Sequence, residues 1–191
     1  VQLGAFGVKI ICLTGGEPLL RKDLLDIVEH AKKQGLSVNI LTSGSLISPD
    51  IASKMVAVGL DDISVSIDGP KEVHNAIRRR DVFDSAISGI RSIQAEKRRS
   101  AAKTPNITIA CTIQRLNQDH LHELVPIAKE LGVHLSYSPL FFMDKDIEHR
   151  THKMVGVAVE AKDENQAVLE YHRCVDVDVL HNELKRVADI A

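Results

Sequence analysis

The stretch LTGGEPLL (Leu13–Leu20) follows directly after the apolar run VKIIC (Val8–Cys12). A run rich in Val and Ile is typical of a buried strand, and the two adjacent glycines then let the chain turn sharply. Glu17, which comes after the glycines, has two interpretations: it caps the next helix, or it belongs to a site at the end of the strand. The stretch alone supports both equally, so the choice depends on the rest of the sequence.

Apolar strands and amphipathic helices alternate along the chain. Strands are predicted at residues 8–13, 37–42, 62–67, 106–113 and 133–141, and helices at residues 22–34, 48–59, 81–99 and 118–132. The second helix has clear end signals, because Ser48 suits the N-cap, Pro49 the first turn and Gly59 the residue after the last turn. The strands are nearly apolar on both faces, which indicates a parallel sheet covered by helices. Five such repeats fit a barrel-like or a doubly wound fold, and their spacing does not distinguish the two.

Length and composition favour one ordinary globular domain. The 191 residues are 44% hydrophobic and 26% charged, with a formal net charge of -2. This charge gives no general attraction to nucleic acid or to anionic lipid, so neither is expected as a partner. No apolar run approaches the roughly 20 residues that span a bilayer, and no signal peptide is recognised. We therefore expect no membrane association.

The cysteines favour a reducing compartment. Cys12, Cys111 and Cys174 are odd in number and far apart, which argues against a disulfide framework and predicts a cytoplasmic location. Cys12 and Cys111 lie within apolar strands, so both are expected to be buried structural thiols.

The histidines do not form a metal-binding pattern. His120 and His122 are too close in sequence to share one helix face, and His149 and His152 lie in an irregular segment. All four are expected to face solvent.

Polar residues collect at the carboxyl ends of the predicted strands, where parallel α/β folds build their sites. They are Thr14, Gly15, Gly16 and Glu17 after the first strand, Thr42, Ser43 and Gly44 after the second, Ser66, Asp68, His74 and Arg78 after the third, and Thr112, Gln114, Ser136 and Ser138 after the last two. Adjacent glycines let a ligand approach the main chain, a carboxylate pairs with an ammonium group, and serine or aspartate suits sugar hydroxyls. This rim predicts a site for a zwitterionic or ribose-bearing ligand, and the second motif SIDGP (66–70) favours that interpretation over a simple turn.

The chain resembles the core of the radical S-adenosylmethionine (AdoMet) enzymes in four segments that occur in the same order. These are LTGGEPLLRKDLLDIVEHAKKQGL (13–36), NILTSG (39–44), DDISVSIDGPKEVHNAIR (61–78) and FDSAISGIRSI (83–93). The resemblance is greatest to the branch with sulfatase-maturing, peptide-modifying and cofactor-building members. It implies a partial (β/α)6 TIM-like barrel with a parallel sheet, lacking its first βα unit, over residues 1–142. An irregular segment and C-terminal helices are expected over residues 143–191.

The resemblance also implies a chemistry. Enzymes of this family bind a [4Fe–4S] cluster through the three cysteines of a C-x-x-x-C-x-x-C loop. They cleave AdoMet to a 5′-deoxyadenosyl radical, which abstracts hydrogen from the substrate. An electron donor such as a ferredoxin or a flavodoxin is therefore an expected partner of the parent enzyme. The substrate, a small molecule or a peptide, is not indicated by these segments.

Individual residues match the family's AdoMet-binding motifs. Gly15, Gly16 and Glu17 match the motif that contacts the methionine amino group. Ser66 matches a position that commonly meets the ribose, and Asp68 lies in the same motif. Ser43 stands where many members have Asn. Arg78 follows the histidine of the third segment, and it either pairs with the methionine carboxylate or lies on the surface.

The chain departs from the family at the cluster motif. No C-x-x-x-C-x-x-C occurs in its 191 residues, and its first strand already carries GGEP, which follows the second strand in the family. Because the chain also begins at Val1 instead of Met, we interpret it as part of a longer protein. By itself, this piece is expected to be inactive in radical chemistry and to bind AdoMet feebly. It is also expected to self-associate through the exposed edge of its first strand.

Two other interpretations remain open. A degenerate, non-catalytic barrel that serves as a binding or assembly module would also lack the cluster motif. A barrel enzyme acting on phosphorylated metabolites fits less well, because the later repeats contain no Gly-rich phosphate loop.

Overall fold

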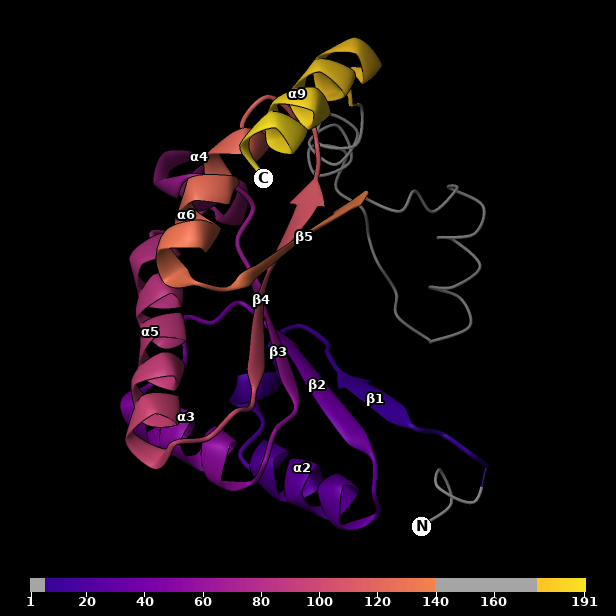
Figure 1. Cartoon of the computed structure of the whole chain (residues 1–191), viewed down its shortest axis with the longest axis vertical. Helices are drawn as coiled ribbons and strands as arrows, with labels where there is room; N and C mark the ends of the chain where they lie inside the picture. Colours follow the sequence, from indigo (N-terminus) through magenta and orange to yellow (C-terminus); the bar gives the residue numbers. More distant parts are fainter. Residues whose placement is uncertain (1–5, 140–174) are drawn as a thin grey trace, which may run out of the picture.

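Five parallel strands form one sheet whose spatial order follows the order of the chain (Figure 1). The computed structural model describes residues 6–139 and 175–191. The strands are β1 (Ile10–Leu13), β2 (Ser37–Thr42), β3 (Asp62–Ser66), β4 (Asn106–Ile113) and β5 (His134–Pro139). The helices are η1 (Pro18–Leu20), α2 (Leu24–Lys33), α3 (Pro49–Ala57), α4 (Lys71–Arg78), α5 (Phe83–Ser100), η2 (Leu121–Glu123), α6 (Leu124–Leu131) and α9 (Val177–Ile190). The predicted α/β class with a parallel sheet is confirmed, and within these residues the sheet is open.

Local signals explain where several helices begin. The Ser48 hydroxyl accepts a hydrogen bond from the Ile51 N–H (3.2 Å) and Pro49 occupies the first turn of α3, as predicted. The helix α4 was not predicted, because it is short and polar and buries only His74. The helix predicted at 118–132 begins later, since the chain forms a loop after β4 before η2 and α6.

The two faces of the sheet differ in polarity. Helices α2, α3, α5 and α6 lie on one face of the sheet (Figure 1). On that face, Ile40, Ile63 and Ile109 are fully buried. On the other face, Asn39 and Ser64 are half-buried, with the Asn39 Nδ2 atom 3.4 Å from the Ser64 Oγ atom. The expectation of strands apolar on both faces is therefore wrong. The residues alternate along β3 and β4, where every second position carries a small or polar side chain.

Helix α5 approaches the loop after β2 closely. A Cβ atom at Gly89 would lie 2.6 Å from the Gly44 carbonyl oxygen, and one at Gly44 would lie 2.6 Å from Cγ1 of Val65. Both positions therefore require glycine. This contact fixes the loop that carries Ser43.

The C-terminal helix α9 is held by a buried carboxylate. Glu183 is 2% exposed, and its Oε1 accepts the backbone N–H of His122 (2.8 Å) and lies 2.5 Å from the His122 Nδ1 atom. His122 therefore does not simply face solvent, because a carboxylate from a distant helix binds it. His120 also has a partner, since its Nδ1 lies 2.6 Å from Oε1 of Glu123.

Some expectations fall outside the described ranges. His149, His152 and the boundary predicted between residues 142 and 143 lie there. None of the helices within the described ranges combines the length and hydropathy needed to cross a bilayer.

Candidate functional site

Glu17 joins the loop after β1 to the loop after β2. Its Oε1 accepts hydrogen bonds from the Leu19 backbone N–H (3.1 Å) and the Thr42 hydroxyl (2.6 Å). Its Oε2 accepts the backbone N–H and the hydroxyl of Ser43, at 2.8 and 2.5 Å. The bond from Leu19 caps η1, whereas the other three reach the next strand exit. Glu17 therefore has both of the roles considered from the sequence: it caps the next helix, η1, and it belongs to the polar group at the strand ends.

These hydrogen bonds occupy the acceptor positions of the Glu17 carboxylate. A carboxylate offers about four lone-pair positions, and Glu17 receives four hydrogen bonds from its own chain. Burial acts to raise the pKa of Glu17, but the bonds from Ser43, Thr42 and Leu19 outweigh it and hold the pKa below its ordinary value of 4.5. Glu17 is thus an anion that fixes two loops, and acceptors for a ligand must come from neighbouring groups.

The glycines before Glu17 leave the backbone of the turn accessible. Gly15 has a φ of 144°, a conformation that residues with a side chain rarely adopt. Beyond the adjacent residues, no described atom lies within 4 Å of the place where a Cβ would stand at Gly15 or Gly16. The peptide groups of this turn are therefore open to a ligand.

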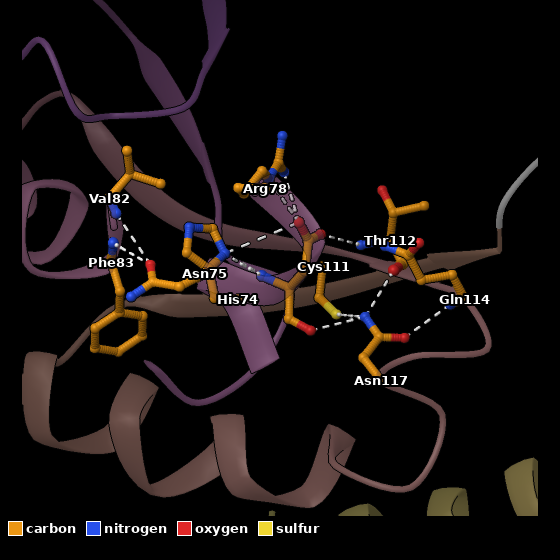
Figure 2. A network of polar contacts seen from close by, with 10 residues as sticks. His74, Asn75, Arg78, Val82, Phe83, Cys111, Thr112, Gln114 and Asn117 are labelled. Carbon is orange, nitrogen blue, oxygen red and sulfur yellow. Dashed lines mark hydrogen bonds and ion pairs between the residues drawn. The ribbon is translucent and has the colours of Figure 1, made fainter. Parts of the chain in front are cut away.

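A second polar group lies at the end of β3, where Asp68 and Arg78 form an ion pair (Figure 2). The Arg78 Nε and Nη2 atoms lie 2.8 and 2.7 Å from the Asp68 Oδ2 atom. The Asp68 Oδ1 atom accepts the backbone N–H of Thr112 (3.2 Å). The side chain of Asp68 is 2% exposed and that of Arg78 is 35% exposed, so the guanidinium reaches the surface while its partner stays buried.

His74 and Asn117 support Asp68 through its backbone (Figure 2). The His74 Nδ1 atom accepts the Asp68 N–H (3.1 Å), and the Asn117 Nδ2 atom donates to the Asp68 carbonyl oxygen (2.7 Å). Burial lowers the pKa of His74 to about 4, although the Asp68 carboxylate acts to raise it, so the ring is neutral at pH 7. The sequence indicated His74 only as a residue near a strand end, and no role was predicted for Asn117.

Ser66 ends β3 next to the exit of β2. Thr42 pairs with Val65 in the parallel register, so Ser43 and Ser66 follow at equivalent positions on neighbouring strands. The predicted residues therefore form two groups, with Ser66 at the strand end that adjoins both. The first group contains Gly15, Gly16, Glu17 and Ser43, and the second contains Asp68 and Arg78.

The described residues do not fit an iron–sulfur cluster. No group of three His, Cys, Asp or Glu side chains that could hold a metal ion occurs among them. Cys111 is buried, as predicted, and burial raises the pKa of its thiol. Cys12 is exposed, contrary to the prediction, because it lies on an edge strand and pairs with Asn39, on the face of the sheet opposite the one that packs against the helices. Cys174 lies outside the described ranges.

A cavity of about 600 Å³ lies at the opposite end of the sheet. It is lined by the end of α5 and the starts of β4 and β5, including Lys97, Asn106 and His134. Neither group of predicted residues borders it. We place the candidate site at the carboxyl ends of the strands, because the buried and mutually bonded polar side chains lie there.

Comparison with known proteins identifies the family. The sequence matches the profile of the Radical SAM superfamily over residues 2–125. It is 32% identical over 144 residues to the AdoMet-dependent heme synthase of Methanosarcina barkeri (strain Fusaro / DSM 804), covering 74% of this chain and 39% of that protein. It is 38% identical over 96 residues to the Fe-coproporphyrin III synthase of the same strain, covering 50% of this chain and 24% of that protein.

Solved structures share the fold at low sequence identity. Streptococcus suis SuiB bound to the precursor peptide SuiA has a TM-score of 0.67 at 13% identity, covering 98% of this chain and 36% of that one. The structure of anSMEcpe with bound AdoMet has a TM-score of 0.57 at 20% identity, covering 71% of this chain and 38% of that one. The chain spans 24% and 39% of the two Methanosarcina relatives. Because the superfamily profile covers well over half of its residues, this chain belongs to the Radical SAM superfamily.

Proposed function

We propose that this chain is the AdoMet-binding part of a radical SAM enzyme. In the reaction, one electron cleaves the C5′–S bond of AdoMet to give methionine and a 5′-deoxyadenosyl radical. The radical takes a hydrogen atom from the substrate and leaves as 5′-deoxyadenosine. The electron source of the whole enzyme is a [4Fe–4S] cluster served by a donor such as a ferredoxin or a flavodoxin. The described residues do not hold that cluster, so their own task is to bind and orient AdoMet.

The grouping of polar residues at adjacent strand ends carries this proposal. The turn at Gly15 and Gly16 offers carbonyl oxygens to the ammonium group of the methionine moiety. This task falls to the backbone because the Glu17 carboxylate is already filled by its own chain. Glu17 then acts by holding the turn in place.

The other groups of the rim suit the rest of the ligand. The Ser66 hydroxyl is half-buried at the end of β3 and suits a ribose hydroxyl. Arg78 uses its Nε and Nη2 atoms on Asp68, which leaves guanidinium N–H groups for the methionine carboxylate. The ammonium and carboxylate groups, which share one carbon of the methionine moiety, and the ribose are thus each matched by a different group of the site.

An NMR titration of the 191-residue chain tests the proposal. On addition of AdoMet, the amide signals of Gly15, Gly16, Ser43 and Ser66 are expected to shift, with weak affinity. Ser66→Ala is expected to weaken binding, whereas Ser92→Ala, at a half-buried serine on α5, is expected to bind as the wild type does. Absence of shifts at the strand ends at millimolar AdoMet, or shifts confined to the opposite end of the sheet, would contradict the proposal.

An experiment on the parent protein distinguishes a catalytic enzyme from a protein that only binds. After anaerobic reconstitution with iron and sulfide, a radical SAM enzyme forms a cluster and releases 5′-deoxyadenosine on reduction. A non-catalytic barrel that serves as a binding or assembly module would give neither result. The 191-residue chain alone is expected to release no 5′-deoxyadenosine.

A further inference from the structure

Asn117 is a buried polar residue that has no direct role in the proposed binding site. It lies in the loop after β4 and is 0% exposed. Its Nδ2 atom donates to the carbonyl oxygens of Asp68 (2.7 Å) and Thr112 (2.9 Å) and lies 3.5 Å from the Cys111 Sγ atom. Its Oδ1 atom accepts the backbone N–H of Gln114 (2.8 Å). The amide group is thus fully bonded to the exits of β3 and β4.

Asp68 also links the ends of β3 and β4, but its side chain reaches from the β3 side to the β4 side (Figure 2). The Asn117 side chain, from the β4 side, reaches the Asp68 backbone, while the Asp68 side chain, from the β3 side, reaches the Thr112 N–H at 3.2 Å. We call this reciprocal pair, Asn117 and Asp68, the exit clamp. Two such bonds fix both the position of the β3 exit and the direction of the Asp68 carboxylate.

The orientation of Arg78 follows from that carboxylate. Both the Nε and the Nη2 atoms of Arg78 bind the same oxygen, Oδ2 of Asp68, at 2.8 and 2.7 Å. The Asp68 backbone is also held by His74, whose neutral ring accepts its N–H at 3.1 Å. The contacts described for the Arg78 guanidinium are therefore with Asp68, which is a member of the exit clamp.

We propose that Asn117 is a positioning residue of the AdoMet site, which acts through Asp68 to set where Arg78 meets the carboxylate of the ligand. This inference rests on the proposed function. Asn117 itself touches no ligand. Its removal frees Asp68 to shift, so Arg78 loses its fixed direction and binding weakens without loss of any contacting group.

The first test needs no ligand. In NMR spectra of the chain, the Arg78 Nε–H signal is expected to be sharp and slow to exchange in the wild type, because it is hydrogen-bonded to a buried carboxylate. In Asn117→Ala this exchange is expected to accelerate about tenfold or more, since 1.4 kcal/mol corresponds to a factor of 10. An unchanged Arg78 signal in this variant overturns the proposal, whether or not AdoMet binds.

The second test is a double-mutant cycle on AdoMet affinity. Asn117→Ala is expected to weaken binding about tenfold in the wild type and to have little further effect in Arg78→Ala, because both changes remove the same interaction. Equal weakening in both backgrounds would show a merely structural role and overturn the proposal. If the wild type does not bind AdoMet, the proposed function fails, while the ligand-free test still decides the exit clamp.

Asn75 provides the matched control. It is another asparagine that braces backbone, since its Oδ1 accepts the N–H groups of Val82 and Phe83 at 3.0 Å each, and it does not touch Asp68. Asn75→Ala is expected to lower stability without changing the Arg78 signal. If Asn117→Ala fails to fold, Asn117→Ser, which replaces the amide by a shorter side chain with a hydroxyl donor, is used with the same readouts.

Discussion

The Glu17 carboxylate accepts both the backbone N–H and the hydroxyl of Ser43, a residue 26 positions later in the chain. A single oxygen, Oε2, receives both bonds, at 2.8 and 2.5 Å. The loops after β1 and β2 are therefore joined where the proposed ligand approaches. A change at Glu17 alters both loops together.

Replacement of Glu17 by glutamine is expected to lower the free energy of unfolding at pH 7 by about 1–3 kcal/mol, since charge-assisted hydrogen bonds are lost. The pKa of Glu17 is lowered in the folded protein, so its contribution is present above its ordinary value of 4.5 and is lost as the pH falls below it. The difference between wild type and Glu17→Gln should therefore shrink in acid. Urea denaturation at several pH values measures both effects.

Glu29→Gln is the control for this prediction, because Glu29 forms an exposed ion pair with Lys33. It is expected to change stability by less than about 0.5 kcal/mol. Equal effects of the two substitutions would show that the bonds of Glu17 contribute nothing special.

Acid is expected to destabilise the protein through His74. Burial lowers the pKa of His74 from 6.5 to about 4, with Asp68 acting to raise it and Arg78 to lower it further. Below pH 6.5 His74 is protonated in the unfolded chain, whereas in the folded chain it stays neutral until about pH 4. The free energy of unfolding therefore falls as the pH is lowered from 6.5 to about 4. His74→Gln keeps an acceptor for the Asp68 N–H and should flatten this slope. A slope in unfolding experiments that is identical in both proteins would refute this account.

Removal of the Glu183 carboxylate is expected to release helix α9. Glu183→Ala leaves the half-buried His122 N–H without its acceptor, and a donor left unsatisfied costs about 1–3 kcal/mol. Hydrogen exchange of residues 177–190 should accelerate strongly. Arg186→Ala is the control, because Arg186 is 64% exposed and lies 3.5 Å from Glu183, and exchange there should change little. Similar exchange in the two variants would mean that α9 is held by its apolar contacts.

The edge of β1 is expected to drive association of the chain. Ile10 is 67% exposed on this edge strand, and unpaired edges invite strand pairing. Sedimentation velocity should show concentration-dependent association of the wild type and less of it in Ile10→Lys. Leu20→Lys, at a residue that is 72% exposed but lies in η1, should associate as the wild type does. A wild type that stays monomeric at high concentration would remove the basis for this prediction.

The strands could be predicted because local pattern decides them. The strands β2 and β4 have the bounds that their Val and Ile content indicated. Exposure depended on more than local pattern. Cys12 lies in a predicted strand, but its exposure follows from the place of β1 at the sheet edge and from the face of the sheet on which Cys12 lies, which are properties of the topology.

The residues of the candidate site could be predicted more readily than their roles. The strand-end motifs and the family resemblance indicated Glu17, Asp68 and Arg78, but not that Arg78 binds Asp68. Asn117 was missed because its main partner lies 49 residues earlier, and an isolated asparagine in a loop has no local signature. Such bonds depend on strand register and loop path, which periodicity does not report.

The order of the sheet has a consequence for how the chain is made. Each strand from β2 to β5 pairs with the strand that was synthesised just before it. A nascent chain that emerges at about 5–20 residues per second can add each strand to an edge that already exists. The helix α9 contacts η2 through Glu183 and His122, so it docks after that segment has emerged. The order of translation is thus also an order in which the fold can assemble.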